Sequence, residues 1–225
     1  MRLIGMLDSP YVRRVAISLQ LLGLRFEHRS VSVFRAFDEF HAINPVVKAP
    51  TLVCDDGTVL MDSGVILEYA QALARRSLLP ADLSELQSDL RVIGLGLAAC
   101  DKSVQLIYER ALRPAEKQYE AWVTRITGQL QAALTGLEAE ITRRPLATRP
   151  ALLTQAGVTT AVTWHFIQRM VPQVAPAAQF PALVGFCGKA ETLAPFRAAP
   201  HGEGICVPTV DADAQISHIT LQPER

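Results

Sequence analysis

The sequence predicts a small α/β domain at the N-terminus, followed by an all-helical domain. In the first third of the chain, strand-like and helix-like stretches alternate in the order β-α-β-α-β-β-α. Over residues 84–143 no strand pattern occurs, and apolar residues recur at three- and four-residue spacings. We place the domains at residues 1–78 and 84–200, and we treat residues 201–225 as a C-terminal tail whose structure the sequence does not predict.

The first three elements form a β-α-β unit. A short apolar strand at residues 2–6 leads to Ser9 and Pro10, which begin a helix with its apolar residues on one face. A serine hydroxyl can cap the free N–H groups there, and proline fits the first helical turn. Gly23 ends this helix. Residues 25–33 then alternate between apolar and polar types, as in a half-buried strand that could pair in parallel with the first.

The rest of this domain contains a helix, a hairpin and a second helix. The polar and aromatic stretch at residues 34–44 occupies the position of the first of these helices. Asp56 and Gly57 lie between two short apolar stretches, which is a strong hairpin signal. Asp62 and Ser63 then precede a stretch with helical spacing, where they could cap a helix.

The second domain begins with two long helices that are broken near Pro114. Ser84 and Gln87 have the spacing of a capping box for the first of them. Apolar residues at helical spacing predict that the two long helices pack together. Further helices are expected at residues 161–171 and 181–193.

The composition provides enough apolar residues for a hydrophobic core, and it disfavours nucleic acids and membranes as partners. The 225 residues are 49% hydrophobic, and 22 Lys and Arg residues balance 22 Asp and Glu residues. This balance does not favour a nucleic acid or a membrane surface as a partner. No stretch reaches the length of a transmembrane helix, and the opening MRLIGML is too short for a signal peptide.

Four cysteines are spaced irregularly and form no CxxC pair. Zinc sites and dithiol redox centres usually contain such pairs. We therefore expect no metal and a reduced, cytoplasmic protein.

Three segments, together with the order of elements, resemble the glutathione transferase family. SPYVRRV at residues 9–15 resembles the catalytic-serine segment of its serine-type members. NPVVKAPTLV at residues 44–53 resembles the NPxGKVPxL segment, and MDSGVILEY at residues 61–69 resembles xESxAIxxY. The resemblance implies a thioredoxin-like N-terminal domain, an all-α C-terminal domain and a soluble, bacterial-like, serine-type member.

The resemblance also implies a glutathione site. Its residues would be Lys48, Ala49, Pro50, Asp62 and Ser63. Pro50 would follow a cis peptide bond, and the exposed backbone of Ala49 would pair with the tripeptide as a short added strand. Asp62 and Ser63, at a helix N-terminus, would hold the γ-glutamyl ammonium and carboxylate, and Lys48 would meet the far carboxylate.

Ser9 has two readings. Its hydroxyl would stabilise the glutathione thiolate, which is the nucleophile in this family. Taken alone, Ser9 is more commonly a structural cap. A serine at this position also disfavours disulfide exchange through an enzyme cysteine.

The second substrate would bind between the domains. The candidate lining residues are Tyr11, Val12, Cys100, Val104 and Tyr108. Tyr108 could donate a hydrogen bond to the electrophile or belong to the core.

The resemblance implies an enzyme that promotes thiolate attack on a small hydrophobic electrophile, as in detoxification, and that forms a homodimer. Two alternatives stay open. The chain could be a non-catalytic binding or interaction module, or it could reduce peroxides, isomerise or dehalogenate its substrate with glutathione.

Two departures from the family pattern have structural consequences. Val47 stands where the family often has glycine, and its side chain could narrow the site. In TQAG, residues 154–157, Gly157 replaces the acidic residue of a capping box. The helix that starts there should therefore lack one of two reciprocal hydrogen bonds.

Overall fold

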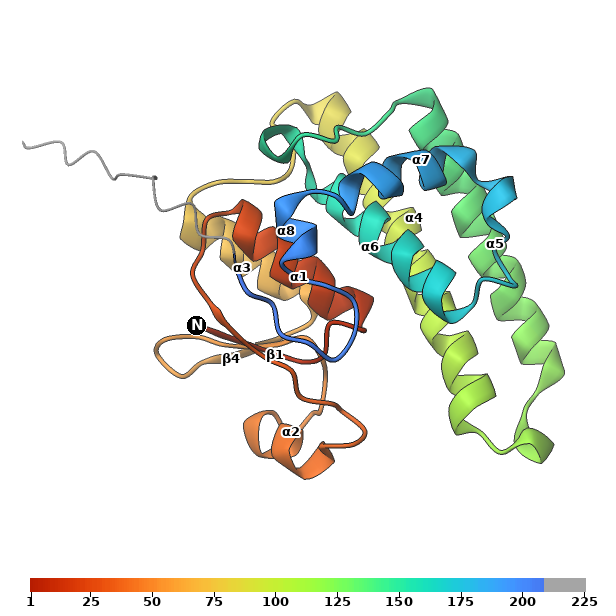
Figure 1. The fold of residues 1–225 in the computed structure, drawn as a ribbon, viewed down its shortest axis with the longest axis horizontal. Helices are drawn as coiled ribbons and strands as arrows, with labels where there is room; N and C mark the ends of the chain where they lie inside the picture. Colours follow the sequence, from red (N-terminus) through yellow and green to blue (C-terminus); the bar gives the residue numbers. More distant parts are fainter. Residues whose placement is uncertain (209–225) are drawn as a thin grey trace, which may run out of the picture.

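A computed structural model describes residues 1–208, which form two lobes packed side by side (Figure 1). The first lobe holds a four-stranded sheet in the order β2-β1-β3-β4. Strand β1 pairs in parallel with β2 and antiparallel with β3, and β3 pairs antiparallel with β4. Its elements are β1 (Arg2–Ile4), α1 (Pro10–Leu21), β2 (Glu27–Arg29), α2 (Phe37–Ile43), β3 (Thr51–Val53), β4 (Val59–Met61) and α3 (Ser63–Ala74).

The second lobe is entirely helical. Two long helices, α4 and α5, run antiparallel and are joined by a π-helical turn at Tyr108–Leu112 and a 3-10 turn at Ala115–Lys117 (Figure 1). The helices of this lobe are α4 (Leu83–Ile107), α5 (Glu120–Arg143), α6 (Gln155–Met170), α7 (Pro181–Ala190) and α8 (Ala194–Arg197). The predicted fold class is therefore confirmed.

The local signals explain most element ends. The Ser9 hydroxyl accepts a hydrogen bond from the Val12 N–H over 3.4 Å, which caps α1. Gly23 and Gly57 have φ angles of +72° and +89°, which glycine adopts readily. The first follows α1, and the second closes the predicted hairpin between β3 and β4.

One predicted cap is wrong. Helix α4 is capped by Asp82, whose carboxylate accepts hydrogen bonds from the N–H groups of Ser84 and Glu85 at 2.9 and 3.0 Å. Ser84 lies inside the first turn and donates its hydroxyl to the same carboxylate. An aspartate accepts N-terminal N–H groups as well as a serine does, and it adds favourable charge at the helix dipole.

Helix α1 lies between the two lobes. Its buried residues pack on α3 within the first lobe and on α6 of the second. Arg13 crosses this junction, and its two terminal nitrogens bond both oxygens of Glu191 at 2.7 and 2.6 Å. The Arg13 Nε also donates to the Ala199 carbonyl at 2.8 Å. These bonds hold the C-terminal end of the helical lobe against α1.

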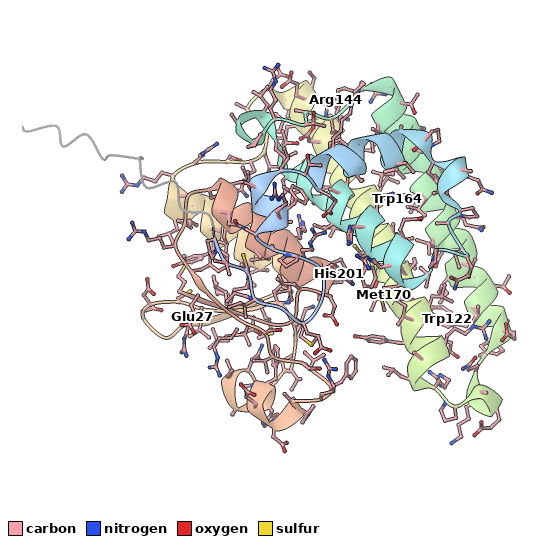
Figure 2. All side chains as sticks on the ribbon, viewed as in Figure 1. Glu27, Trp122, Arg144, Trp164, Met170 and His201 are labelled. Carbon is pink, nitrogen blue, oxygen red and sulfur yellow. The ribbon has the colours of Figure 1, made fainter. Side chains whose placement is uncertain are left out.

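The chain after α8 turns back across the first lobe. His201 lies where the lobes meet, with its ring 5.4 Å from that of His165 (Figure 2). The Ser30 hydroxyl donates to the Glu203 carbonyl at 2.7 Å, and the Cys206 N–H donates to the His28 ring at 2.9 Å. Residues 201–208 are therefore part of the folded structure, and the rest of the predicted tail lies outside the described residues.

The start of α6 lacks both bonds of a capping box, whereas the TQAG departure predicts the loss of only the bond that an acidic residue at position 157 would make. Thr154 makes no capping hydrogen bond. The start is held instead by Gln155, whose N–H donates to the Leu78 carbonyl at 2.8 Å and whose amide oxygen accepts from Ser18 at 3.1 Å. A Cβ atom at Gly157 would lie only 2.7 Å from the Leu153 side chain, so any side chain at this position would force Leu153 to move.

Introducing the acidic residue of a capping box by Gly157→Asp should therefore destabilise the protein. The added side chain meets Leu153 and Phe186, and overpacking of this kind costs about 1–3 kcal/mol. Urea unfolding would measure the change. The control is Gly128→Ala in α5, where a Cβ meets nothing within 4 Å and where we expect stabilisation of about 0.5–1 kcal/mol. A more stable Gly157→Asp variant would show that the lost cap outweighs the packing.

No helix within residues 1–208 combines the length and the apolar character that a bilayer crossing requires.

Candidate functional site

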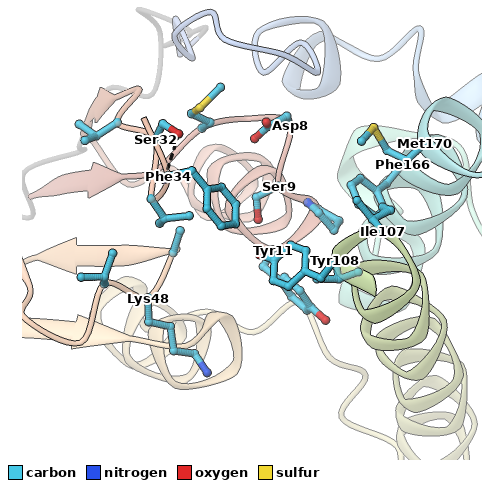
Figure 3. Close-up of a pocket in the computed structure, with 17 residues that line it drawn as sticks. Asp8, Ser9, Tyr11, Ser32, Phe34, Lys48, Ile107, Tyr108, Phe166 and Met170 are labelled. Atoms are coloured by element: carbon cyan, nitrogen blue, oxygen red, sulfur yellow. Dashed lines mark hydrogen bonds between the residues drawn. The ribbon is translucent and has the colours of Figure 1, made fainter. Parts of the chain in front are cut away.

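A cavity of about 390 Å³ opens between the two lobes (Figure 3). One wall comes from the first lobe, from the loops around the start of α1 and before β3. The other wall comes from the C-terminal ends of α4 and α6. The lining includes Met6, Asp8, Ser9, Tyr11, Phe34, Val47, Lys48, Ala49, Val104, Ile107, Tyr108, Phe166 and Met170.

Ser9 lies at the floor of this cavity, at the N-terminus of α1 (Figure 3). Its hydroxyl oxygen accepts the long bond from Val12, and within residues 1–208 the hydroxyl proton has no acceptor. A free O–H at a helix N-terminus is suited to an anion in the cavity. The capping and ligand-binding interpretations of Ser9 are therefore compatible.

Ala49 presents a free backbone to the same cavity. The Ala49–Pro50 peptide bond is cis. Pro50 itself is buried, and the ladder of β3 begins only at Thr51. Neither the N–H nor the C=O of Ala49 has a hydrogen-bond partner among residues 1–208. An extended peptide could pair with both groups.

Val47, two residues earlier, also lines the cavity, with a φ angle of +51°. This backbone conformation favours glycine and is unusual for a β-branched residue. The side chain of Val47 thus occupies space that the family's glycine would leave open.

Lys48 and Asp62 form an ion pair beside the cavity. The Lys48 Nζ lies 3.3 Å from the Asp62 carboxylate, and both side chains are about half exposed. Asp62 also accepts a hydrogen bond from the Gly64 N–H at 2.9 Å, which caps α3. Although partial burial acts in the opposite direction, the bonds from Gly64 and Lys48 hold the pKa of Asp62 below its usual value. Asp62 is therefore ionised at neutral pH.

Ser63 is the first residue of α3 and is buried. Its hydroxyl oxygen accepts a hydrogen bond from the Arg14 guanidinium at 3.0 Å. Arg14 was not among the residues expected from the sequence. Asp62 and Ser63 do not line the cavity itself, so a ligand would have to extend from the cavity across Ala49 to reach them.

The structure brings only part of the expected acceptor pocket together. Tyr11, Val104 and Tyr108 line the cavity. Val12 and Cys100 do not, which corrects their placement in the pocket. Val12 is fully buried, and the Cys100 thiol bonds Thr163 at 3.1 Å in the helical core, where burial raises its pKa to about 12.

Phe34 and Asp8 are among the cavity residues that the sequence analysis missed. Phe34, from the loop before α2, meets the Tyr108 ring edge-on across the cavity, with ring centroids 5.6 Å apart. Asp8 places a carboxyl group in the lining, and burial raises its pKa. Both residues lie in loops. Loops lack the periodic pattern from which the direction of a side chain can be inferred.

Residues 3–77 match the family model described as "Glutathione S-transferase, N-terminal domain". An uncharacterized GST-like protein of Escherichia coli, YibF, is 28% identical over 173 residues, which cover 76% of this chain and 85% of that protein. The comparisons support the glutathione transferase family.

Solved structures from the glutathione transferase family agree over the whole described fold. A family member from Pseudomonas fluorescens Pf-5, solved with bound glutathione, is 27% identical with a TM-score of 0.76. The match covers 89% of this chain and 98% of that one. A glutathione S-transferase from Methylobacterium radiotolerans has a TM-score of 0.81 at 24% identity, covering 91% and 96% of the two chains, and supports the fold.

In the part of the chain that the structure describes, no group of three or more His, Cys, Asp or Glu side chains could hold a metal ion. The site residues above are hydroxyl, backbone, ammonium and carboxylate groups, which are suited to an organic ligand.

Proposed function

We propose that this protein is a serine-type glutathione transferase. The observation that carries the proposal is the convergence of three features at one cavity. These are the Ser9 hydroxyl, whose proton has no acceptor among residues 1–208, the Ala49 backbone, which has no hydrogen-bond partner in the same range, and the nearby helix start at Asp62 and Ser63. A relative from Pseudomonas fluorescens Pf-5 with the same fold binds glutathione, which supports the same ligand here.

Glutathione would lie along the edge next to β3. Its peptide groups would pair with the Ala49 N–H and C=O, next to Pro50. The γ-glutamyl carboxylate would meet Ser63 and the free N–H groups of α3, and its ammonium would meet Asp62. Lys48 would bind the far carboxylate. Because the Lys48–Asp62 pair is exposed, its rearrangement costs little, since such pairs contribute about 0–1 kcal/mol.

Ser9 would favour the thiolate form of glutathione. Its hydroxyl would donate a hydrogen bond to the sulfur, and the N-terminus of α1 would favour the negative charge. Both effects lower the pKa of the thiol. The thiolate would then attack an electrophilic carbon of the second substrate, forming a carbon–sulfur bond while the leaving group departs with its electron pair.

The cavity favours a small hydrophobic electrophile. Tyr11, Val104 and Tyr108 line it together with further apolar side chains from both lobes. Apolar lining with few polar groups is typical of sites for hydrophobic ligands. Detoxification of such compounds is the role we propose.

Calorimetric titration of the protein with glutathione tests this function. We expect saturable binding to one site per chain, and turnover with at least one member of a panel of hydrophobic electrophiles. If glutathione binds but the protein shows no transfer, no peroxide reduction, no isomerisation and no dehalogenation, a non-catalytic module would be favoured. The absence of binding at millimolar glutathione would overturn the proposal.

We also propose a homodimer, formed through the outer face of α3. Val65, Tyr69 and Leu73 lie four residues apart on this helix and are 50%, 36% and 47% exposed. An apolar stripe of this kind is commonly covered by a partner. Sedimentation at micromolar concentration should show a dimer for the wild type and a monomer for the double variant Val65→Asp/Leu73→Asp.

The control for the dimer is Leu112→Asp, which adds one of the two negative charges at an exposed leucine beyond the end of α4. This variant should remain dimeric. A monomeric wild type would contradict the proposal.

The location that we propose is the cytoplasm. All four cysteines are free and buried, which agrees with a reducing compartment.

A further inference from the structure

Arg14 is a buried arginine whose hydrogen bonds go only to hydroxyl groups. Its side chain extends from α1 between α3 and α6, and the residue is 4% exposed. Its Nε donates to the Thr159 hydroxyl at 2.9 Å, and its Nη1 donates to the Ser63 hydroxyl at 3.0 Å. No carboxylate of residues 1–208 lies within ion-pair distance of it.

The neighbouring Arg13 shows what a buried guanidinium usually requires. Arg13 is equally buried, and it bonds both oxygens of the Glu191 carboxylate. Buried charges are normally paired, because their removal from water is costly. Burial lowers the pKa of Arg14 to about 10, so the side chain still carries its charge at neutral pH. Arg14 is therefore a buried cation that no carboxylate of residues 1–208 bonds directly, and Asp62 acts on it only from beyond ion-pair distance.

The Ser63 hydroxyl connects this cation to the start of α3. Because Ser63 accepts from Arg14, its own proton is available to a further acceptor. A hydroxyl that accepts from a cation is also a stronger donor. Ser63 is the first residue of a 12-residue helix, whose N-terminal N–H groups also favour an anion. An anion bound at Ser63 would thus meet the helix terminus and bring a second negative charge, beside that of Asp62, close to Arg14.

We propose that Arg14 is a positioning residue for glutathione, acting through Ser63 on the γ-glutamyl carboxylate. The inference rests on the proposed function, since it assigns a role to a further residue of the same site. Arg14 does not touch the ligand in this arrangement. It orients the Ser63 hydroxyl and places a positive charge behind it.

The test compares two ligands on four variants by calorimetry. The ligands are glutathione and the analogue that lacks the α-carboxylate of its γ-glutamyl residue. Arg14→Gln should lower the affinity for glutathione about 10- to 100-fold, as expected for a charge-assisted hydrogen bond. It should lower the affinity for the analogue less than threefold. Arg14→Lys, which keeps the charge, should fall between the wild type and Arg14→Gln.

Ser63→Ala provides the control for a purely structural role. If Arg14 acts through Ser63, Arg14→Gln should change the glutathione affinity less than threefold when Ser63→Ala is already present. If Arg14→Gln instead disorders the whole site, it should still lower the glutathione affinity in the Ser63→Ala variant. If circular dichroism shows that Arg14→Gln does not fold, the two ligands are compared on Arg14→Lys instead. In that variant we expect the affinity for glutathione to fall at least threefold and the affinity for the analogue to stay unchanged.

The outcomes separate this inference from the proposed function. Equal losses for both ligands, or an undiminished loss in the Ser63→Ala background, would overturn the role of Arg14 while glutathione binding stands. A wild type that binds neither ligand would overturn both proposals.

Discussion

Ser9→Ala should lower kcat/KM for the transfer reaction by about 10²- to 10³-fold, the typical effect of removing one donor to a reacting anion. The same variant should raise the pKa of the thiol of bound glutathione by at least one unit, which corresponds to about 1.4 kcal/mol. The reason is that the Ser9 hydroxyl is the donor placed at the helix start inside the cavity. Ultraviolet absorbance of the bound thiolate against pH measures the pKa, and calorimetry measures whether glutathione still binds.

The cap role of Ser9 requires its own control, because Ala also removes the hydrogen bond from Val12. Ser9→Gly removes the hydroxyl too, but glycine is tolerated at a helix cap at a cost of only a few tenths of a kcal/mol. Equal losses of activity in the two variants, despite unequal losses of stability, would assign the effect to chemistry. A thiol pKa that is unchanged in both variants would show that another group activates the thiol.

Glu191→Ala should lower the free energy of unfolding by about 3 kcal/mol, at the lower end of the range for breaking a buried ion pair. The variant leaves Arg13, which is 2% exposed, with bonds only to backbone carbonyls. Urea unfolding measures the effect. Because Glu191 does not line the cavity, glutathione affinity in the folded variant should change little.

Glu203→Ala is the matched control for Glu191→Ala. Glu203 also pairs with an arginine, Arg35, but both of these side chains are largely exposed. Its loss should cost less than about 1 kcal/mol. Equal costs for the two variants would show that burial of Arg13 is not what makes the Glu191 pair important.

Much of the fold could be predicted because its signals are local. The Ser9 cap, the Asp56-Gly57 hairpin and the break near Pro114 each depend on a few adjacent residues. The cap of α4 could not be chosen in the same way. Asp82 and Ser84 are both good caps two residues apart, and only the finished structure shows which one precedes the first turn.

The site was less predictable, because it depends on contacts between segments far apart in the chain. Periodicity places Cys100 on the apolar face of α4, but it does not distinguish the core from the cavity wall. The contact between Phe34 and Tyr108 joins a loop of the first lobe to the π-helical turn after α4 in the second. The roles of Ser9, Asp62 and Ser63 rest on the family resemblance and on geometry, and they stay predictions until ligand binding is measured.

One signal for Arg14 was present in the sequence. Arg13 and Arg14 stand inside an otherwise apolar helix, where long charged residues are uncommon unless they are paired. Their partners are Ser63 in α3, Thr159 in α6 and Glu191 just after α7, and they could not be identified from spacing.

These two arginines have a consequence for how the chain is divided. Arg13 bonds Glu191 near the end of the helical lobe, and Arg14 joins α3 to α6. Two charged side chains of α1 therefore hold this helix against the second lobe. An isolated first lobe would leave both guanidinium groups without most of their partners. The boundary near residue 80 therefore divides the sequence into two patterns, but we expect the two lobes to unfold together in one transition.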